Sequence, residues 1–337
     1  MKTAFVTGGA GFLGLNLLEQ LVPAEWEVVV FDRAVGAAAS LDKPGVCCVE
    51  GDITDLTACR AAMPEGVDAV FHVAADTSHW RRADARQTRI NVDGTRVVVS
   101  AALERKAQRF IHTSSIAAYG FQPGRIGEES RSTALASSIN YFRTKRLAEL
   151  EVERGIERGL DAVILNPANI VGPCDRSGWS RFFGLIERGE LPGVPPGRAS
   201  FCHVREVAAA QLAAWDRGQP GHHYLLGGAD ASFLELIQNI GKLLGLPIPM
   251  RTTPAVLVKL MGRLSLWGSY VTGREPDLTP EKATLVTAEL VCSSHKAERE
   301  LGYRPVSLES MLEDCHRWLL EEGLLSTPEP RAGGQAA

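Results

Sequence analysis

The chain has 337 residues, of which 45% are hydrophobic and 23% are charged. This length allows about two domains of ~100–200 residues each, and the composition excludes a disordered or fibrous chain. Because 36 Lys and Arg residues stand against 40 Asp and Glu residues, the formal net charge is −4. A basic excess that could neutralise a phosphate backbone is missing, so no nucleic-acid partner is expected.

The first half alternates short apolar strands with helices. Strands are predicted at 2–6, 27–31, 47–50, 68–75, 109–113 and 161–165, and helices at 11–21, 56–63, 91–106 and 141–158. Continuous apolar strands separated by helices are typical of a parallel sheet that is covered on both faces. Residues 1–172 are therefore predicted to form a doubly wound α/β domain.

The pattern changes after residue 172. Pro and Gly cluster at 191–197, and the predicted elements are helices at 179–188, 207–217, 233–244, 254–266 and 308–322 with strands at 201–204 and 224–226. Residues 173–325 are expected to form a smaller, mainly helical lobe, from which some elements return to the first domain. This lobe could close a ligand crevice at the carboxyl ends of the strands.

The ends and the cysteines indicate a compartment. The apolar run after Met1 is too short for a signal peptide, and no stretch of about 18 uncharged apolar residues predicts a membrane-spanning helix. The seven cysteines form no C-x-x-C pair, so neither a metal site nor a disulfide framework is expected. We expect a cytoplasmic protein with reduced thiols and a flexible tail over 326–337.

A glycine-rich turn, TGGAGFLG at 7–14, connects the first predicted strand to the first helix. Gly8, Gly11 and Gly14 would allow a tight turn and the close approach of a pyrophosphate to the helix N-terminus. Asp32 ends the next strand, where a carboxylate can accept the ribose hydroxyls of NAD. Arg33 could instead attract the 2′-phosphate of NADP, but the strand-end position of Asp32 favours NAD.

Asp52 follows the third predicted strand, within GDITD at 51–55. Its carboxylate could accept a hydrogen bond from the adenine amino group, with Ile53 against the ring. The alternative is a helix N-cap, a role for which Thr54 or Asp55 suffices.

Tyr141 and Lys145 are four residues apart and would share one helix face. A neighbouring ammonium and a nicotinamide charge favour the phenolate, which would lower a tyrosine pKa from about 10 and allow general acid/base catalysis. Ser114 and Ser115 follow the strand at 109–113, at the same edge of the sheet. The alternative is an ordinary surface pair on the helix.

Together these segments resemble the extended short-chain dehydrogenase/reductase family of Rossmann-fold NAD(P) enzymes, over about residues 2–325. The motifs that carry the resemblance are TGGAGFLG (7–14), GDITD (51–55), FHVAA (71–75), NVDGT (91–95), TSSIAAYG (113–120), YFRTK (141–145), LNPANIVGP (165–173) and HVREVA (203–208). The resemblance implies that Ser115 polarises a carbonyl, that Tyr141 transfers the proton, and that Lys145 holds the nicotinamide ribose and lowers the tyrosine pKa. It also implies a homodimer through the helices near 91–106 and 141–158.

The complete set of expected cofactor-binding residues follows from the turn, the strand ends and this resemblance. It comprises Gly8, Gly11, Phe12, Leu13, Gly14, Asp32, Arg33, Asp52, Ile53, Ala74, Ala75, Asn91, Ser114, Tyr141, Lys145, Pro167 and Asn169. NAD is the expected cofactor, and no metal is expected.

Within that family the sequence is most similar to the dihydroflavonol-reductase and 3β-hydroxysteroid-dehydrogenase-like branch, through FHVAADTSHW (71–80), LNPANIVGP and SSHKAERELGYRP (293–305). Nucleotide-sugar epimerases usually have a threonine where this chain has Ala117, and sugar dehydratases have an Asp-Glu pair near Ile116. These departures favour an oxidoreductase that interconverts a secondary alcohol and a ketone. The alternatives are a nucleotide-sugar epimerase with the same machinery and a dinucleotide-sensing regulator without turnover.

The substrate is expected to be bulky and largely apolar, because the segments that would surround it are rich in aromatic and aliphatic side chains. The expected contacts are His79, Trp80, Ile116, Tyr119, Trp179 and Phe183, together with Phe182, Leu257, Met261 and Trp267. Arg176, Arg181 and Arg198 are the few arginines that could bind a diphosphate.

Leu257, Leu260, Met261, Leu264 and Trp267 form an apolar stripe at helical spacing. Core packing is the default interpretation of such a stripe. The alternatives are an apolar lid over the active site and a shallow contact with a membrane.

Overall fold

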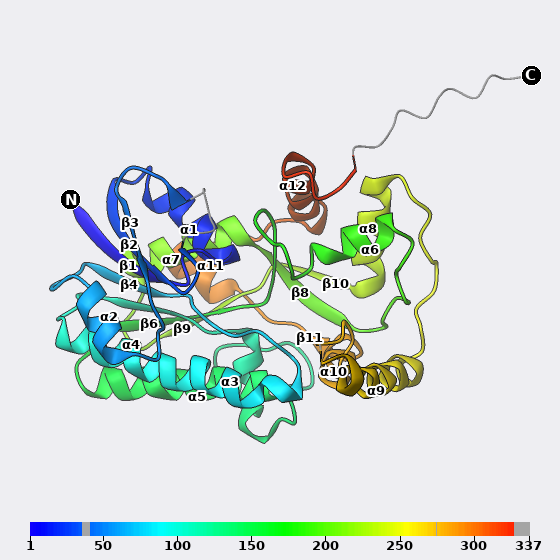
Figure 1. The fold of residues 1–337 in the computed structure, drawn as a ribbon, viewed down its shortest axis with the longest axis horizontal. Coiled ribbons are helices and arrows are strands. Elements are labelled where there is room, and N and C mark those ends of the chain that lie inside the picture. Colours follow the sequence, from blue (N-terminus) through cyan, green and yellow to red (C-terminus); the bar gives the residue numbers. More distant parts are fainter. Residues whose placement is uncertain (36–40, 274, 327–337) are drawn as a thin grey trace, which may run out of the picture.

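The structure is a computed structural model that describes residues 1–35, 41–273 and 275–326. Its centre is a seven-stranded sheet in the order β3-β2-β1-β4-β5-β6-β9, with parallel pairing throughout (Figure 1). The strands are β1 (Lys2–Thr7), β2 (Trp26–Asp32), β3 (Val46–Glu50), β4 (Ala69–His72), β5 (Phe110–Thr113), β6 (Ala162–Pro167) and β9 (His223–Leu226). The strand order reverses between β1 and β4, which opens a crevice at their carboxyl ends.

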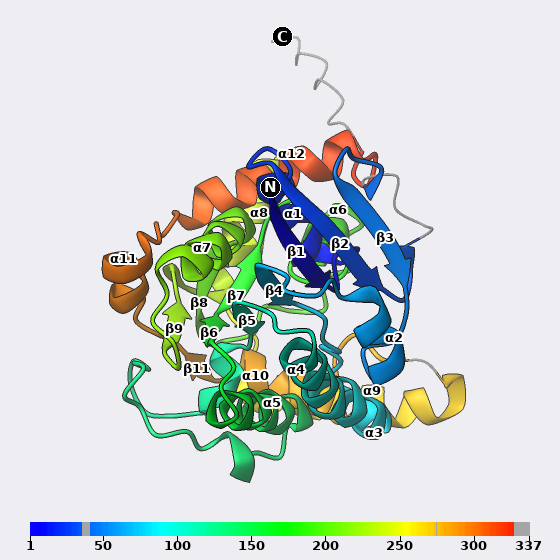
Figure 2. The ribbon, with the colours of Figure 1, turned by 90° about the vertical axis from the view of Figure 1, so that its left-hand side faces the viewer.

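Helices cover both faces of this sheet (Figure 2). On one face lie α1 (Phe12–Leu21), α7 (Val204–Arg217) and α11 (His295–Leu301), and on the other lie α2 (Leu56–Ala62), α4 (Gly94–Glu104) and α5 (Asn140–Glu157). The strands are apolar on both sides because both sides are covered: Ala4 and Val6 pack toward α1, whereas Phe5 packs toward α2 and α4. The expected doubly wound α/β fold is therefore confirmed.

The second lobe has a small sheet of its own, which makes it less helical than expected. In this four-stranded sheet β8 (Arg198–His203) pairs with β7 (Asn169–Val171), β10 (Ala229–Ser232) and β11 (Glu289–Leu290). Its helices are α6 (Arg181–Glu187), α8 (Phe233–Leu244), α9 (Ala255–Thr272), α10 (Pro280–Val286) and α12 (Leu308–Glu321). The three strands that flank β8 are only two to four residues long, too short to give an alternating pattern.

Two boundaries differ from the expectations in ways that affect the site. The predicted strand at 68–75 ends at His72, because the chain then leaves the sheet, and Val73, Ala74, Ala75 and Thr77 line the crevice. The predicted helix at 91–106 begins earlier, as α3 (Asp84–Thr88) followed by a π-helical turn over Arg89–Asp93. Short 3₁₀ turns complete the list of elements, at Arg81–Ala83, Ile116–Tyr119 and Ala134–Ala136.

The chain returns to the first domain after the expected boundary at residue 172: β9 follows that residue and pairs with β6 in the large sheet. Apart from Ser326, the expected flexible tail at 326–337 lies outside the described residues. Within the described ranges, none of the helices is long and apolar enough to cross a membrane.

Gly14 provides a test of the packing between α1 and the turn before it. A Cβ on Gly14 would lie 2.3 Å from the carbonyl oxygen of Gly8 and 2.6 Å from the Cα of Gly9. Alanine at this position would therefore push α1 away from the backbone of the glycine turn. We expect Gly14→Ala to lower the free energy of unfolding by about 1–3 kcal/mol or more, measured by urea denaturation. Gly268→Ala in α9 is the matched control, since its added Cβ meets nothing within 4 Å and alanine is the better helix former. Equal losses in both variants would contradict the packing account.

Candidate active site

A cleft of about 2090 Å³ runs along the carboxyl ends of the large sheet and continues into the second lobe. Most of the expected cofactor residues line it: Gly8, Gly11, Phe12, Leu13, Asp32, Arg33, Asp52, Ile53, Ala74, Ala75, Ser114, Tyr141, Lys145, Pro167 and Asn169. Gly14 and Asn91 are the two members of that set that do not line it. Because one cleft joins the two regions, a dinucleotide and a second molecule could meet inside it.

The glycine turn has a shape that other residues would not adopt. Gly8 has a φ of 73°, and a Cβ there would lie 2.7 Å from the backbone of Ala74. The amide of Gly11 donates to the carbonyl of Gly8 at 3.1 Å and closes the turn. Gly14 acts behind this turn, where it lets α1 pack onto the backbone. The result is a backbone cradle at the N-terminus of α1, which Gly11 caps without a side-chain hydrogen bond, and this shape fits a pyrophosphate.

Asp32 lies over this turn, at the end of β2. Its Oδ2 accepts a hydrogen bond from the amide of Ala10 at 3.1 Å, which fixes the carboxylate beside the cradle. Arg33 is exposed at the rim of the same cleft. A fixed carboxylate at this position fits the ribose of a dinucleotide.

Asp52 does not cap α2. The cap is Asp55, which accepts the amides of Thr57 and Ala58. Asp52 instead accepts the amide of Thr54 at 2.8 Å, a bond that contributes most to a lowered Asp52 pKa. Asp52 is therefore an ionised carboxylate at the cleft wall.

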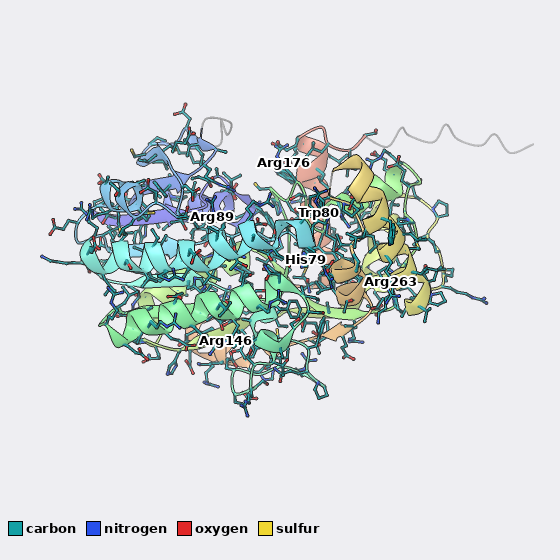
Figure 3. All side chains as sticks on the ribbon, turned by 60° about the horizontal axis from the view of Figure 1, so that its bottom comes forward. His79, Trp80, Arg89, Arg146, Arg176 and Arg263 are labelled. Atoms are coloured by element: carbon teal, nitrogen blue, oxygen red, sulfur yellow. The ribbon has the colours of Figure 1, made fainter. Side chains whose placement is uncertain are left out.

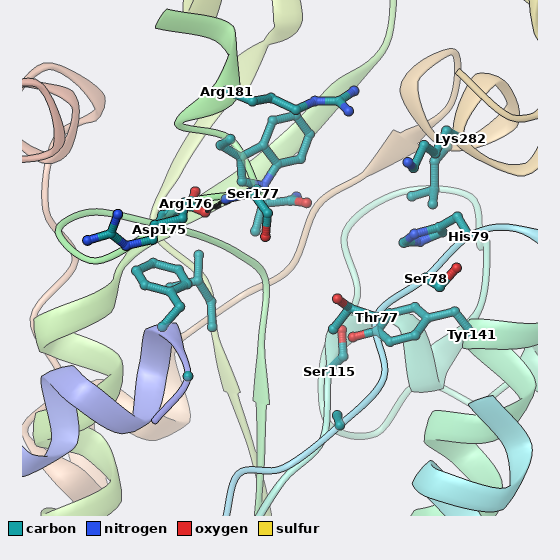
Figure 4. A pocket seen from close by; sticks show the side chains of 18 of the residues that line it. Thr77, Ser78, His79, Ser115, Tyr141, Asp175, Arg176, Ser177, Arg181 and Lys282 are labelled. Carbon is teal, nitrogen blue, oxygen red and sulfur yellow. Dashed lines mark hydrogen bonds between the residues drawn. The ribbon is translucent and has the colours of Figure 1, made fainter. Parts of the chain in front are cut away.

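Three hydroxyl groups converge where β5 and α5 meet the cleft. Figure 4 shows Ser115, Tyr141 and Thr77 directed toward one another. Lys145 is buried beneath them: its Nζ donates to the carbonyl of Thr113 at 3.0 Å and lies 5.9 Å from the centre of the Tyr141 ring. Thr77 was not among the site residues selected from the sequence.

The pKa of Tyr141 differs from the expectation. Burial raises it to about 12, and a hydrogen bond with Ser115 opposes the rise only in part. Burial also lowers the pKa of Lys145 to about 8, against the attraction of Glu149. Desolvation thus dominates the Tyr141 pKa, and Tyr141 is a neutral phenol near neutral pH. A neutral phenol can donate a proton.

Glu149 is a functional candidate that the sequence reasoning missed. It is buried one helical turn beyond Lys145, and its Oε1 accepts from Ser114 Oγ and from Asn166 Nδ2, both at 2.6 Å. Asn166 also donates to the carbonyl of Ser115 at 3.1 Å. Glu149 therefore joins α5 to the ends of β5 and β6. Its i+4 spacing from Lys145 was the available signal.

Asn91 lies behind the cleft wall. Its side chain accepts from the amide of Asp76 at 2.7 Å, and it donates to the Asp76 carbonyl at 2.9 Å and to Thr144 at 3.1 Å. Thr144 in turn donates to the carbonyl of Tyr141. Asn91 thus fixes the loop at 76–80 against α5 without lining the cleft.

Of the two substrate contacts expected on the loop at 76–80, His79 lines the cleft and Trp80 does not. The His79 ring lies 5.2 Å from the Tyr141 ring, and burial lowers the His79 pKa to about 4. His79 is therefore a neutral neighbour of Tyr141. Trp80 does not line the cleft; Arg82 lies over its ring instead. Figure 3 shows His79 and Trp80 where the first domain meets the second lobe.

The second lobe provides an aromatic wall. The Trp179 ring stacks on Phe182 and on Phe233, at 5.9 and 5.4 Å between ring centres. All three line the cleft, as do Ile116 and Met261.

Several expected wall residues lie elsewhere. Tyr119 and Phe183 are buried in hydrophobic cores behind the wall, because the 3₁₀ turn and α6 direct them inward. Leu257 and Trp267 belong to α9 but are exposed. Helical spacing identifies a shared face, but it does not say what that face contacts.

Arg176, Arg181 and Arg198 all line the cleft. Arg176 pairs with Glu322 at 2.5 Å and Arg181 pairs with Asp277 at 3.4 Å. The loop that carries Arg176 is held by the buried Asp175, whose carboxylate accepts three backbone amides from Ser177, Gly178 and Ser180. Asp175 is thus a positioning residue that the sequence reasoning did not select.

Comparison with known proteins identifies the family. Residues 4–227 match the NAD-dependent epimerase/dehydratase family. The chain belongs to this family. It is an enzyme of the extended short-chain dehydrogenase/reductase type, as the sequence motifs implied.

The similarity extends over nearly the whole chain. Sterol demethylase protein B of Methylococcus capsulatus is 32% identical over 96% of this chain and 100% of the relative. A putative dihydroflavonol 4-reductase of Synechocystis sp. is 30% identical over 96% of each chain. Among solved structures, gox2253 superposes with a TM-score of 0.83 at 27% identity, over 97% of this chain and 100% of the other. The solved structure therefore shares the fold of this chain over nearly its whole length.

The buried ammonium of Lys145 predicts a pH dependence of stability. Its folded-state pKa lies near 8 and its ordinary value is 10.5, so the unfolded chain binds more protons between these values and wild-type stability rises with pH there. The Lys145→Met variant has no ammonium group at this position and therefore lacks this rise of stability with pH. Relative to the variant, wild type should gain up to about 1.4 kcal/mol per pH unit in this window, measured by urea denaturation at about pH 7 and about pH 10. An unchanged difference between the two proteins would contradict the buried charge.

Proposed function

We propose that this protein is an NAD-dependent oxidoreductase that interconverts a secondary alcohol and a ketone on a bulky, largely apolar molecule. The observation that carries the proposal is the continuity of the cleft. It connects the glycine turn and Asp32 to Ser115, Tyr141 and Lys145, and then to the aromatic wall of the second lobe. A dinucleotide and an apolar substrate could therefore meet at the Tyr141 hydroxyl.

The residues that would hold the cofactor are the turn at 8–14, Asp32, Asp52 and Lys145. When bound, the dinucleotide supplies or accepts the hydride. NAD is proposed over NADP because the Asp32 carboxylate, fixed by Ala10, repels a 2′-phosphate. Arg33 is exposed at the rim and is the residue that could oppose this preference.

The chain's own chemistry is proton transfer and orientation. Ser115 would donate a hydrogen bond to the substrate oxygen, and Tyr141 would donate the proton that this oxygen needs when a ketone becomes an alcohol. The raised pKa of Tyr141 keeps that proton in place until a substrate accepts it. Lys145, held by the Thr113 carbonyl, favours the phenolate that remains.

An apolar substrate is proposed from the wall of the second lobe. Trp179, Phe182 and Phe233 present stacked rings to the cleft, and Ile116 and Met261 add aliphatic surface. Covering such surface contributes roughly 25 cal/mol per Å². The names of the relatives, a sterol demethylase protein and a dihydroflavonol reductase, agree with this class.

A nucleotide-sugar epimerase is the second candidate, because three arginines of the second lobe, Arg176, Arg181 and Arg198, line the cleft. Arg176 and Arg181 already have carboxylate partners, Glu322 and Asp277. A diphosphate would have to replace these partners, which weakens the case.

A cytoplasmic location and a homodimer through the outer faces of α4 and α5 remain part of this proposal. Neither enters the proposed chemistry.

A substrate panel tests the proposed reaction. Bulky steroid-like, lipid-like and aryl ketones are incubated with the protein and NADH, and NADH absorbance is followed. UDP-sugars are titrated by calorimetry in parallel. The proposal expects net NADH oxidation with at least one apolar ketone and weak or absent binding of UDP-sugars. Micromolar UDP-sugar binding that depends on Arg176 or Arg198, without net NADH change, would replace it with the epimerase.

Tyr141→Phe should lower turnover by about 10²–10⁴-fold, because it keeps the ring and removes the transferable proton. Affinity for NADH, titrated by cofactor fluorescence, should change little. Tyr224→Phe is a matched control: its hydroxyl contacts Gln219 and Glu300 outside the cleft, so turnover should be retained. A Tyr141→Phe variant with most of the wild-type rate would eliminate the proposed proton donor.

Asp32→Ala should weaken NAD binding about tenfold or more, since charge-assisted hydrogen bonds contribute about 1.5–3 kcal/mol. Arg33→Ala should leave NAD affinity nearly unchanged. Both variants are compared with wild type by fluorescence titration with NADH and with NADPH. Tighter binding of NADPH than of NADH to wild type would reverse the assignment and make Arg33 the deciding residue.

A further inference from the structure

Exposed apolar side chains are concentrated in one part of the molecule. Among the described residues, the large exposed hydrophobic side chains include Leu246, Met250, Val256, Leu257, Leu260, Leu264 and Trp267. Elsewhere in the part of the chain that the structure describes, only Met1, Leu135 and Leu324 belong to this group. Val256 is 81% exposed and Trp267 is 76% exposed. Such a concentration on one helix indicates an interaction surface.

The exposed face of α9 is distinct from the face that serves the cleft. Val256, Leu260, Leu264 and Trp267 recur at helical spacing and point away from the protein. The opposite face contributes Val258, Met261, Ser265 and Gly268 to the cleft wall. The protein therefore uses one side of α9, and the other side has no partner in the described part of the chain. In Figure 2, α9 extends from the edge of the molecule.

The charge around this face is one-sided. Residues 236–274 contain no Asp or Glu, although acidic residues outnumber basic ones in the whole chain. Lys259 and Arg263 are exposed beside the apolar face and, within the described residues, form no ion pair with a carboxylate. Figure 3 labels Arg263 on this helix. Together with Arg81 they line a small cavity of about 340 Å³, in which only Glu281 is acidic.

We propose that α9 docks this protein onto the surface of a membrane that contains anionic lipids. The apolar face enters the boundary between headgroups and acyl chains, and Lys259 and Arg263 contact the lipid phosphates. An interfacial helix has this combination of an apolar face, a basic flank and no acidic residue. A second copy of this chain fits less well, because a two-fold contact would bring Lys259 and Arg263 close to their own copies.

Docking through α9 has a consequence for the substrate. The same helix lines the cleft through Met261 and Ser265, so the wall of the cleft would lie against the bilayer. An apolar ketone or alcohol dissolved in lipid could then enter without crossing water. This consequence rests on the proposed function; the docking itself does not.

Vesicle binding without substrate tests the docking alone. Wild-type protein is sedimented with phosphatidylcholine vesicles and with vesicles that also contain phosphatidylglycerol. We expect binding to the second kind, decreasing as salt is raised. Combining Leu260→Ser, Leu264→Ser and Trp267→Ser should weaken it about 100-fold or more. Combining Lys259→Glu and Arg263→Glu should weaken it about tenfold or more.

Matched controls change similar residues elsewhere on the surface. Leu135 and Leu324 are 51% and 44% exposed, and serine at both positions should leave vesicle binding unchanged. Glutamate at Lys106 and Arg158, which are exposed beyond the far ends of α4 and α5, is the charge control. All variants should keep the wild-type thermal midpoint, because these side chains are exposed. They should also keep the wild-type NADH affinity, because none of these side chains lines the cleft.

Three results would overturn the proposal. One is the absence of wild-type binding to anionic vesicles at low salt. Another is equal binding by wild type and both α9 variants. The third is a wild-type dimer, detected by light scattering, that the α9 substitutions dissociate while vesicle binding is absent; the face would then be a contact between copies. Because no substrate is present, each result is independent of the reaction.

Discussion

The arrangement of this active site depends on one buried ammonium group. Lys145 is buried, which lowers its pKa, and its Nζ is held by the carbonyl of Thr113 at the end of β5. Tyr141 lies one turn before it and Glu149 one turn after it, so a single stripe of α5 faces the ends of β5 and β6. Glu149 compensates the charge and binds Ser114 and Asn166. Any shift of α5 would therefore move Tyr141 away from Ser115 and from the cleft.

The rest of the molecule supplies two different surfaces to this stripe. On the first domain, free backbone at the glycine turn and a fixed Asp32 suit a charged, polar cofactor. On the second lobe, rings from Trp179, Phe182 and Phe233 suit an apolar molecule. The crossover at β1 and β4 opens the crevice, and β9 returns from the second lobe to the same sheet. The two surfaces are thereby held on one framework.

The sequence predicted what depends on local pattern. Five of the six strands of the first half were recognisable because they are largely buried on both faces, and the glycine turn because its spacing has a mechanism. The sixth, β3, is an edge strand in which Cys47, Cys48 and Glu50 are exposed. The strands β7, β10 and β11 were missed, since they are short and form by pairing with β8, which is distant from them in the sequence. Tyr119 and Phe183 were predicted to contact the substrate because pattern does not distinguish a core from a cleft wall. Glu149 and Asp175 were missed because their roles depend on contacts distant in sequence or formed by a loop.

The central claim is that the cleft transfers hydride between a dinucleotide and an apolar substrate, with a net change in oxidation state. The most direct measurement uses NADH that carries deuterium at both positions of the reactive nicotinamide carbon, an apolar ketone, and mass spectrometry of the product. The account predicts an alcohol with deuterium on the carbinol carbon and NAD formed in equal amount. An unlabelled alcohol, or a UDP-sugar inverted while NADH is unchanged, would contradict it.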